Sequence, residues 1–300
     1  MSEREQLEPA FGTYTLPRPL AALRNFANDR GASYYDKRIA SLIRRLLYSI
    51  SKAPYDVTVF RNQRVRLFPK SNRCEKRAFV GLSSWDDQER AAIAADIARH
   101  DDHTPFVFLD CGANVGLYSL FARDEALARG KIFRGMAIEP DPINQKRLAF
   151  NLAASGAREI ILAPFAVGRE NSTVQFVSAV SNRGEAHVLT GKETLPEGAV
   201  VSVPMRPLLD LLGEHGFDHI DVMKIDVEGH EIHALEPFFK TAPRDLWPRK
   251  ILIEVGRSQV SEALKMCLSI GYKVEKAINI NAYLSLEAPE TRLASSQPGN

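Results

Sequence analysis

Four ionisable side chains crowd into one short segment of this sequence. They are Lys224, Asp226, Glu228 and His230, which occupy alternate positions. Clustered titratable groups are costly unless they are solvated or used, and they are typical of functional sites. The acidic start of an ordinary helix would also explain the pattern, because carboxylates favour helix N-termini. We favour a functional role, since residues 220–223 predict a strand whose carboxyl end would carry the segment to a ligand cleft.

A turn containing glycines follows an earlier apolar run. Residues 106–110 predict a strand ending at Asp110, and Gly112, Asn114 and Gly116 follow it. The glycines would let the backbone approach a ligand closely, or they could serve the geometry of the turn alone. Their spacing is not the G-x-G-x-x-G pattern that cradles a pyrophosphate at a helix N-terminus. An acid at the lip suits a cationic ligand better, so a nicotinamide oxidoreductase is disfavoured.

A further carboxylate, Glu139, ends the next predicted strand. It lies 29 residues after Asp110 in the sequence. A carboxylate at this place in a nucleotide-binding unit can accept hydrogen bonds from both hydroxyls of a ribose. Asp141, directly before Pro142, is better placed to cap the following helix. Glu139 is therefore left for a ligand.

The elements that must position these side chains alternate along the rest of the chain. Strands are predicted at residues 106–110, 132–139, 159–164, 220–226, 250–255, 272–277 and 282–286, and helices at 116–129, 142–154, 207–215, 231–239 and 258–270. This alternation predicts an α/β fold with a mostly parallel sheet and helices on both faces. Residues 166–204 break the alternation with β-type patterning, which predicts an inserted hairpin.

The N-terminal part has a different pattern. Residues 1–35 are polar and contain three prolines, which predicts an extended or loosely ordered arm. An amphipathic helix is predicted from an apolar stripe with spacings of three and four, formed by Ile39, Leu42, Ile43, Leu46, Leu47 and Ile50. Flanking basic residues would suit an anionic membrane. Burial in this protein or against a second copy is the commoner role of such a stripe, and a homodimer would be one way to cover it.

These patterns divide the chain into four segments. Residues 1–54 would form the arm and amphipathic helix, and residues 55–104 a lead-in with a hairpin at 57–68 and a helix at 85–99. Residues 105–288 would form the ligand-binding domain. The polar tail, residues 289–300, is expected to be disordered.

Composition disfavours several classes of protein. The 300 residues include 39 Lys and Arg against 37 Asp and Glu, a net charge of +2, so no basic excess points to nucleic acid as a partner. The three cysteines form no C-x-x-C pair, so neither a disulfide framework nor a cysteine-rich zinc site is expected. No secretory signal and no run of 18 apolar residues is evident, which predicts a cytoplasmic protein without a transmembrane segment.

The motifs in this order resemble the FkbM-type methyltransferases. The resemblance rests on segments 110–116 and 224–231, on Glu139 followed by Pro140, and on Asn151 in the next predicted helix. It covers roughly residues 55–260. It implies a class I methyltransferase fold, a Rossmann-like architecture, with S-adenosylmethionine as methyl donor. It also implies O-methylation of a small molecule, often at a sugar or polyketide hydroxyl, although the acceptors of the family vary widely.

The resemblance also implies which residues bind the cofactor. They are Asp110, Gly112, Asn114, Gly116, Glu139, Pro140, Ala166 and Val167. The first four would face the amino-acid end of S-adenosylmethionine, and Glu139 would hold the ribose beside Pro140. The last two, which follow the third strand, would lie against adenine.

Methyl transfer to an alcohol needs help from the protein, because an alcohol is a weak nucleophile at neutral pH. Asp226, at a strand end beside the cleft, is the first candidate for the general base. His230 is the second, since histidine titrates near the working range. Glu228 would orient Lys224 or the acceptor.

A metal ion offers an alternative role for the acids. Asp226 and Glu254 end neighbouring predicted strands, so both carboxylates could face one cavity. Oxygen ligands suit Mg²⁺, which could bind a diol and acidify it. Two carboxylates are few ligands for an ion, however, and a structural salt-bridge role is favoured over a metal site.

Two other functions remain open. A nucleic-acid methyltransferase finds its best support in the basic residues 70–77, but short basic runs are usually solvated. A non-catalytic scaffold that only binds the cofactor is the other. The sequence favours a small-molecule or carbohydrate acceptor and no nucleic acid.

Overall fold

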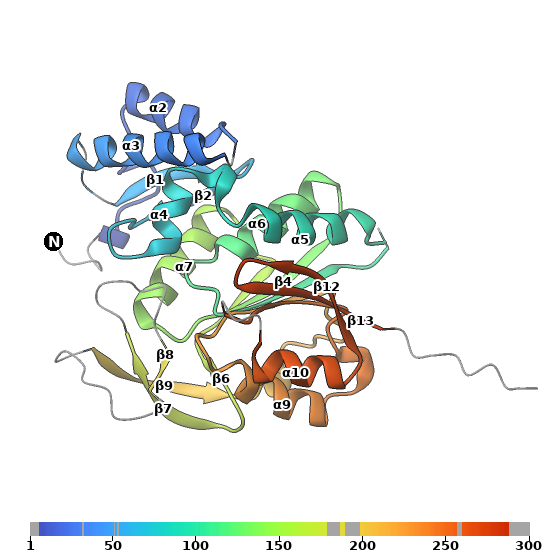
Figure 1. Cartoon of the computed structure of the whole chain (residues 1–300). Coiled ribbons are helices and arrows are strands. Elements are labelled where there is room, and N and C mark those ends of the chain that lie inside the picture. Colours follow the sequence, from blue (N-terminus) through green and yellow to red (C-terminus); the bar gives the residue numbers. More distant parts are fainter. Residues whose placement is uncertain are drawn as a thin grey trace, which may run out of the picture.

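A central sheet organises the computed structural model, which describes residues 6–31, 33–50, 52, 54–101, 103–178, 187–189, 199–256 and 260–287. Its seven described strands are, in spatial order, β12 (Tyr272–Ile278), β13 (Asn281–Leu286), β11 (Lys250–Glu254), β10 (Val222–Ile225), β3 (Phe106–Cys111), β4 (Phe133–Ile138) and β5 (Ile160–Ala163). From β11 to β5 the strands are parallel, whereas β13 pairs antiparallel with both β11 and β12. The predicted mostly parallel sheet is confirmed (Figure 1).

The strand order creates a switch point between β3 and β10. The chain runs outward from β3 through β4 to β5 and then returns to β10 on the other side of β3. Such a reversal opens a crevice at the carboxyl ends of the strands. The register sets Lys224 of β10 opposite Asp110 of β3, so two predicted site residues are neighbours across this point. The arrangement is the class I methyltransferase fold that the sequence predicts.

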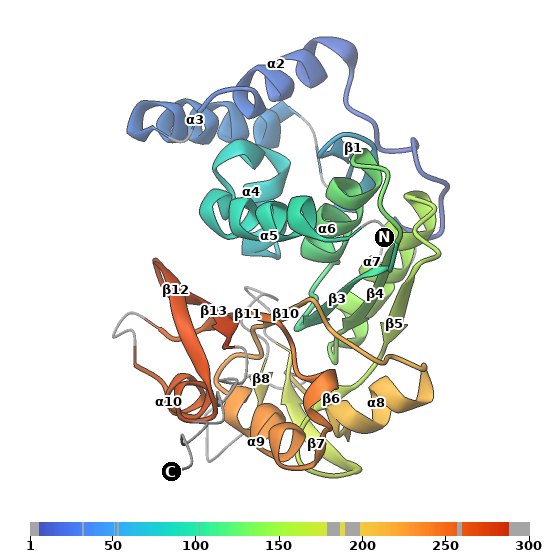
Figure 2. The same ribbon diagram turned by 90° about the vertical axis from the view of Figure 1, so that its right-hand side faces the viewer.

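Helices cover both faces of the sheet (Figure 2). One face carries α5 (Asp87–Arg99), α6 (Leu117–Ala128) and α7 (Pro142–Ala154), and the other carries α8 (Leu208–Glu214), α9 (Glu231–Thr241) and α10 (Glu262–Ser269). Phe106 and Phe108 of β3 pack on the first side and Leu109 on the second, because successive side chains of a strand point to opposite faces. Asp141 caps α7 as predicted, since its side chain accepts hydrogen bonds from two backbone N–H groups of the first turn.

The N-terminal part packs on the same face as α5, α6 and α7. It contains α2 (Arg18–Asn28), α3 (Tyr34–Ile50), the antiparallel hairpin of β1 (Tyr55–Val59) and β2 (Gln63–Leu67), α4 (Arg73–Phe79) and the short 3₁₀ helix η1 (Leu82–Ser84); a second, η3 (Arg244–Leu246), follows α9. The predicted hairpin is confirmed. Buried residues of this part belong to one cluster with those of α6 and α7. The core therefore passes without a break across the expected boundaries at residues 54 and 104.

The prediction of an extended arm over residues 1–35 is wrong for α2. Prolines 17 and 19 suggested a break in structure, yet the first turn of a helix tolerates proline because its N–H groups have no helical partner. Pro17 is the N-cap and the second proline lies in the first turn. Arg24 anchors the helix, since its Nε donates to the backbone oxygen of Phe79 at 2.7 Å. Burial lowers the pKa of Arg24 to about 10.

The apolar stripe of α3 is only partly covered. Ile43 and Leu47 are buried, whereas Leu42, Leu46 and Ile50 are 63%, 46% and 57% exposed. The stripe was expected to be buried, and within this chain that expectation is wrong for its outer edge. The stripe is wider than the surface that the rest of the chain packs against it. Among the described helices, none is both long and apolar enough to cross a membrane.

The predicted insert at residues 166–204 contains a second sheet. Its described strands are, in spatial order, β6 (Ala166–Val167), β9 (Val200–Arg206), β7 (Ser172–Val177) and β8 (His187–Val188). Strands β7 and β9 are antiparallel, which confirms the hairpin, and β6 adds a parallel pairing to β9. Residues 179–186 and 190–198 lie outside the described residues, as does the tail for which disorder is expected.

Candidate functional site

A cavity of about 600 Å³ opens at the carboxyl ends of β3, β4 and β10. Ten of the twelve predicted site residues line it: Gly112, Asn114, Glu139, Pro140, Ala166, Val167, Lys224, Asp226, Glu228 and His230. Asp110 and Gly116 do not. The strands of a parallel sheet end at one edge, and this edge brings together motifs that lie more than a hundred residues apart in the sequence.

Gly112 holds the two motif loops against each other. A Cβ added to Gly112 would lie 1.9 Å from the backbone oxygen of Asp226, and its φ of 78° is in the left-handed region. Only glycine permits such an approach. The backbone N–H of Asp226 also donates to the oxygen of Cys111 at 3.1 Å. The loop after β3 and the loop after β10 therefore form one unit.

Asp110 points into the protein and not into the cavity, which corrects the expectation that it faces a ligand. Its Oδ2 accepts hydrogen bonds from the N–H and Oγ of Ser119 at 3.1 and 2.7 Å. The reason is the alternation along β3, which directs position 110 toward α6. Gly116 also serves packing, because a Cβ there would lie 2.4 Å from Cδ1 of Leu148.

Lys224 is the charged centre of the site. Its Nζ lies 3.5 Å from Oδ1 of Asp110 and 3.4 Å from Oδ2 of Asp226, and it donates to the oxygen of Gly112 at 3.1 Å. Burial acts to lower the pKa of Lys224, but the carboxylates of Asp226 and Asp110 together raise it above its usual value. Lys224 is therefore a fixed ammonium that orients Asp226, and its positive charge makes it unsuitable as a base.

Three carboxylates gather at the ends of β10 and β11. Asp226, Glu228 and Glu254 each offer an oxygen, and these oxygens lie within 4.8 Å of one another. The structure thus brings Asp226 and Glu254 together, as their positions on neighbouring strands predict. Burial, followed by the charge of Asp226, raises the pKa of Glu254 to about 8. Glu254 is therefore protonated at neutral pH and shares a hydrogen bond with Asp226.

The loop after β10 is shaped by Glu231. Its Oε1 accepts hydrogen bonds from the backbone N–H groups of Val227 and Gly229 at 3.1 and 3.2 Å. Glu228, between them, has a φ of 53°, a conformation that non-glycine residues adopt at a cost and that is common at functional sites. Burial lowers the pKa of His230 to about 4. His230 is thus neutral but weakly basic, which favours Asp226 over it as a general base.

Glu139 has a structural task besides lining the cavity. Its Oε2 accepts from the backbone N–H of Asn114 at 2.7 Å, and its Oε1 accepts from that of Asp141 at 2.9 Å. It therefore links the loop after β3 to the start of α7. Burial raises the pKa of Glu139 to about 8. The carboxyl group nevertheless reaches the cavity, where each oxygen can form a further hydrogen bond.

The apolar end of the cavity lies where the second sheet begins. Ala166 and Val167 of β6 are buried and line it, and Phe165 just before them lines it as well. Phe176 and Val188 of the insert close the same side. Sequence reasoning missed these three residues, because the insert carries no motif that marks its inward-facing positions.

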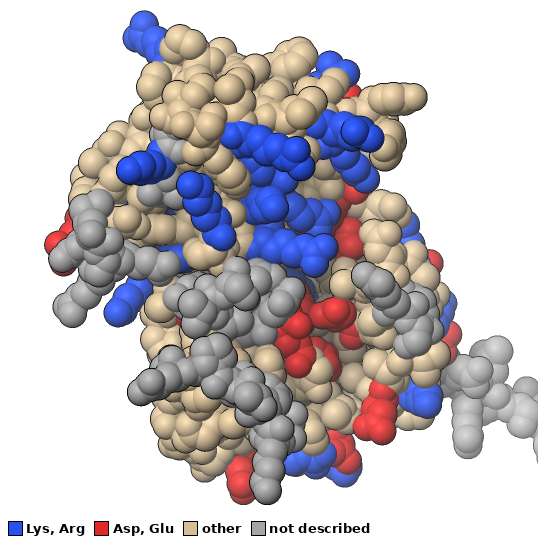
Figure 3. All heavy atoms as spheres, turned by 60° about the vertical axis from the view of Figure 1, so that its left-hand side comes forward, with Lys and Arg blue, Asp and Glu red and all other residues tan. Residues whose placement is uncertain are grey.

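The N-terminal part supplies a wall that sequence reasoning also missed. Lys37 of α3, Arg73 and Arg77 of α4, and Trp85 line the cavity opposite the acids. On the face shown in Figure 3, Lys and Arg side chains gather above the opening, and Asp and Glu side chains lie below it. The basic residues 70–77 had been interpreted as a solvated run. The sequence contains one signal for α4: Asn72 is followed three residues later by Glu75, a pattern typical of a helix N-terminus.

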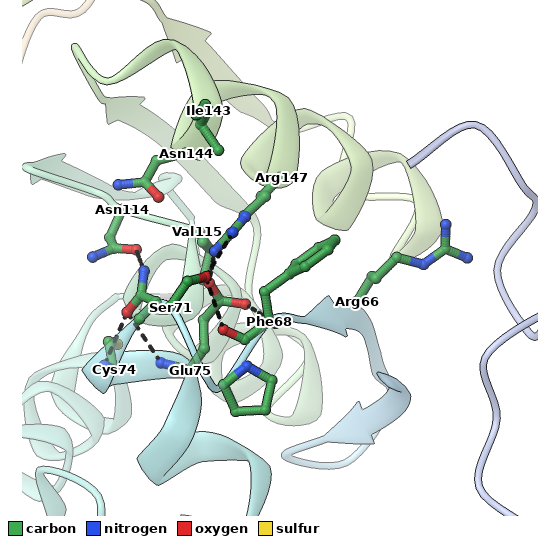
Figure 4. A network of polar contacts seen from close by, with 12 residues as sticks. Arg66, Phe68, Ser71, Cys74, Glu75, Asn114, Val115, Ile143, Asn144 and Arg147 are labelled. Carbon is green, nitrogen blue, oxygen red and sulfur yellow. Dashed lines mark hydrogen bonds and ion pairs between the residues drawn. The ribbon is translucent and has the colours of Figure 1, made fainter. Parts of the chain in front are cut away.

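A polar network fixes α4 beside the loop after β3 (Figure 4). Asn72, the N-cap of α4, donates from Nδ2 to Oδ1 of Asn114 at 2.6 Å. Glu75 of α4 forms a fully buried ion pair with Arg147 of α7 and accepts the backbone N–H of Phe68. Asn114 therefore supports the N-terminal wall in addition to lining the cavity.

Comparisons with known proteins agree on one family. The family model described as the methyltransferase FkbM domain matches residues 110–274. The protein named methyltransferase sdnD from Sordaria araneosa is 33% identical over 159 residues, which span 44% of this chain and 60% of that protein. The match thus extends over less than two thirds of the length of this relative.

Among solved structures, similarity is low. A precorrin-6y C5,15-methyltransferase from Geobacter metallireducens GS-15 has a TM-score of 0.38 and 17% identity, covering 66% of this chain and 85% of its own. The N-terminal domain of human METTL16 has a TM-score of 0.42 and 12% identity, covering 89% and 92%. Similarities at this level indicate no acceptor.

Proposed function

Because this chain belongs to the FkbM methyltransferase domain family, we propose that it transfers the methyl group of S-adenosylmethionine to a hydroxyl oxygen of a small molecule or sugar. The observation that carries this proposal is the position of Asp226. Its side chain is 41% exposed, in the same cavity that Glu139 lines. A ribose-binding carboxylate and a base for the acceptor would therefore share one space.

The lining of the cavity suits S-adenosylmethionine. The carboxyl of Glu139 would accept the ribose hydroxyls beside Pro140, and the apolar end formed by Ala166 and Val167 would hold adenine. The backbone of Gly112 and the side chain of Asn114 would lie along the amino-acid end. A volume of about 600 Å³ is within the range of cofactor pockets and leaves little unused space for a large acceptor.

The residues of this chain would act by placing the acceptor and taking its proton. The bound cofactor supplies an electrophilic methyl group on a sulfonium. Asp226 would hold the acceptor hydroxyl in line with that methyl, and alignment of this kind provides much of the rate. Asp226 would accept the hydroxyl proton as the new bond forms. Lys224 fixes the orientation of Asp226, and Glu228 at the exposed lip would contact the acceptor.

A proton shared between Asp226 and Glu254 supports base catalysis over a bound Mg²⁺. The pair holds one proton at neutral pH, and the ammonium of Lys224 already faces Asp226. A divalent cation would have to displace that proton, although three converging oxygens are ligands it could use. Chelation distinguishes the two roles and is included in the test of Asp226 in the Discussion.

Glu139→Ala should weaken binding of S-adenosylmethionine by about 1–3 kcal/mol, because it removes the two ribose hydrogen bonds and each typically contributes about 0.5–1.5 kcal/mol. Calorimetric titration of the cofactor measures it. Glu170→Ala, an exposed acid outside the cavity, is the control and should bind normally. Glu139→Gln keeps the shape but leaves one oxygen for the two backbone N–H groups of Asn114 and Asp141, so the free energy of unfolding of both variants is measured beside the affinity to separate lost ribose contacts from a collapsed loop. Unchanged affinity in Glu139→Ala would remove Glu139 from the cofactor site.

Three alternatives make different demands on the cofactor and the acceptor. A nicotinamide enzyme would bind NAD in preference to S-adenosylmethionine, and mass spectrometry of the nucleoside that co-purifies with the protein tests this. A non-catalytic scaffold would bind S-adenosylmethionine without converting it to S-adenosylhomocysteine on any acceptor. A nucleic-acid methyltransferase would transfer label from the cofactor to RNA or DNA.

The exposed edge of α3 supports a second copy of this chain as its cover. Leu46→Glu should shift the protein from dimer to monomer in light scattering. Its free energy of unfolding should stay within about 0.5 kcal/mol of the parent, since this side chain is half exposed. Leu268→Glu, which alters a similarly exposed leucine of α10, is the control. A monomeric parent that floats with anionic vesicles, with flotation lost in Leu46→Glu, would assign this edge to a membrane.

A further inference from the structure

Charge is unevenly distributed within the cavity. Lys37, Arg73 and Arg77 stand on the wall formed by α3 and α4, and the carboxylates of Asp226 and Glu228 stand on the loop after β10. Two acids, Asp86 and Glu89, also line the N-terminal side, where Asp86 forms an ion pair with Arg77 and burial raises the pKa of Glu89. In Figure 3, Lys and Arg side chains lie above the opening, and Asp and Glu side chains lie below it. An anionic substituent would be repelled by the acids and attracted to the opposite wall, with energies that depend on how far the site is desolvated.

The cationic wall has capacity for a ligand. Arg77 forms an ion pair with Asp86 at 3.1 Å and its side chain remains 45% exposed. An arginine carries five N–H donors in a planar fork that matches carboxylate and phosphate oxygens, so one ion pair leaves donors for a ligand. Lys37 is exposed on α3 and adds a point charge. Three cations from two helices thus converge on one part of the lining.

The wall is held rigidly with respect to the reacting end of the cavity. Asn72 ties the start of α4 to Asn114, and the buried pair of Glu75 and Arg147 ties α4 to α7. Cys74 of α4 is close enough to both Lys224 and Arg77 for each to act on the pKa of its thiol, although burial raises that pKa overall. A group bound to α4 would therefore have a fixed position relative to Asp226.

We propose that Lys37, Arg73 and Arg77 form a subsite that binds an anionic group of the methyl acceptor, a phosphate, sulfate or carboxylate, while the hydroxyl end lies at Asp226. This assignment rests on the proposed function, since it gives the acceptor a class: a small hydroxylated anion. Repulsion by the carboxylates of Asp226 and Glu228 would orient the acceptor with its anionic group toward the cations. The subsite lies before the region that the family model matches, so this chain supplies it from its own N-terminal part.

A small acceptor fits better than a nucleic acid. The three cations line a cavity of about 600 Å³. A polyanion would need several phosphate contacts outside the cavity, and the net charge of the chain is only +2. Carboxylates at the opening would also repel the flanking phosphates.

Binding of inorganic phosphate and sulfate to the full chain tests the subsite directly. Trp85 lines the cavity and Trp247 does not, so Trp247→Phe leaves one reporter fluorophore in the site. At constant ionic strength, we expect a saturable change in Trp85 emission. Arg73→Gln with Arg77→Gln should weaken the apparent affinity about tenfold or more, the loss expected for hydrogen bonds to a charged group.

The matched control is Lys70→Gln with Lys76→Gln, which removes the same charge from exposed positions outside the cavity lining. It should leave phosphate binding unchanged. Lys37→Gln, at an exposed helix position, tests the subsite without disturbing the ion pair of Arg77. Equal weakening in both double variants would overturn the proposal, because it would show only non-specific attraction. Tighter binding of a short RNA than of phosphate, lost equally in both, would also overturn it.

Methyl transfer to matched acceptors gives an independent readout. Tritium transfer from S-adenosylmethionine is compared for glucose, glucose 6-phosphate and glucuronate as probes. We expect transfer to the anionic members, with the double arginine variant raising KM about tenfold at nearly unchanged kcat. Transfer that prefers neutral acceptors, with KM unaffected by the variant, would overturn the subsite and leave the proposed function standing. Absence of cofactor binding would overturn the proposed function, while the phosphate titration would still decide the subsite.

Discussion

Asp226→Asn should lower the turnover of methyl transfer by about 10²–10⁴-fold, the usual contribution of a general base, with the affinity for S-adenosylmethionine unchanged. The substitution keeps the shape of the side chain and removes its charge. Asp226 faces the cavity from the end of β10, and Lys224 and Glu254 hold its carboxylate in place. Its backbone packs on Gly112, so the loop should remain in place in the variant.

Single-turnover measurement on the acceptor identified by the tritium assay, with calorimetry of the cofactor, provides the test. Asp245→Asn, an exposed acid of η3 that does not line the cavity, serves as control and should match the parent. Turnover at the parental rate in Asp226→Asn would make Asp226 structural. If the parent keeps its activity after exhaustive chelation, Mg²⁺ is removed from the mechanism.

The pH profile gives a second readout of the same group. Burial and the charge of Asp226 keep Glu254 protonated up to about pH 8. When pH rises through that value, Glu254 loses its proton, and the added negative charge makes Asp226 a stronger proton acceptor. Turnover should therefore rise across pH 8 in the parent. Glu254→Gln should remove this step, and a step that persists in Glu254→Gln would assign the titration to another group.

Arg147→Met should destabilise the fold by about 3–5 kcal/mol, the cost of leaving one member of a buried ion pair without its partner. The side chains of Arg147 and Glu75 are both fully buried. Arg147 also donates from Nη2 to Oγ of Ser71 at 2.9 Å, so its loss affects the approach to α4 as well. The free energy of unfolding in urea, monitored by circular dichroism, measures the effect.

Lys146→Met is the matched control, since Lys146 is the neighbouring residue of α7 and is exposed. It should change stability by no more than about 0.5 kcal/mol. A double variant, Arg147→Met with Glu75→Met, should recover part of the loss, because no charge is then left buried without a partner. Equal destabilisation by the single and double variants would mean that packing, and not charge, dominates at this site.

Local sequence determined most of the central domain. Short apolar runs that alternate with helical segments predicted the strands of the central sheet. A strand buried on both faces is apolar along its length, so each run is visible in the sequence by itself. Asp141 before Pro142 fixed the start of α7 through bonds within one turn. The glycines of the loop after β3 and the charges after β10 were evident for the same reason, since both motifs are continuous in the chain.

Some local signals were outweighed by context. Proline at 17 and 19 suggested a break, although α2 accommodates one at its N-cap and the other in its first turn. The basic side chains of residues 70–77 are exposed, as expected of a solvated run, but the segment also forms α4, whose other face buries Glu75. In both segments the deciding contacts come from residues far away in the sequence, such as Phe79 for Arg24 and Arg147 for Glu75.

The composition of the site was decided by tertiary structure. Asp110 and Lys224 became an ion pair because β10 returns beside β3, and this pairing turns a predicted ligand contact into a support for Asp226. The cationic wall arises because the N-terminal helices pack over the carboxyl edge of a sheet that begins much later in the chain. A sequence specifies which residue types follow one another, whereas the distances between charges on separate elements exist only once the sheet order and its covering helices are set.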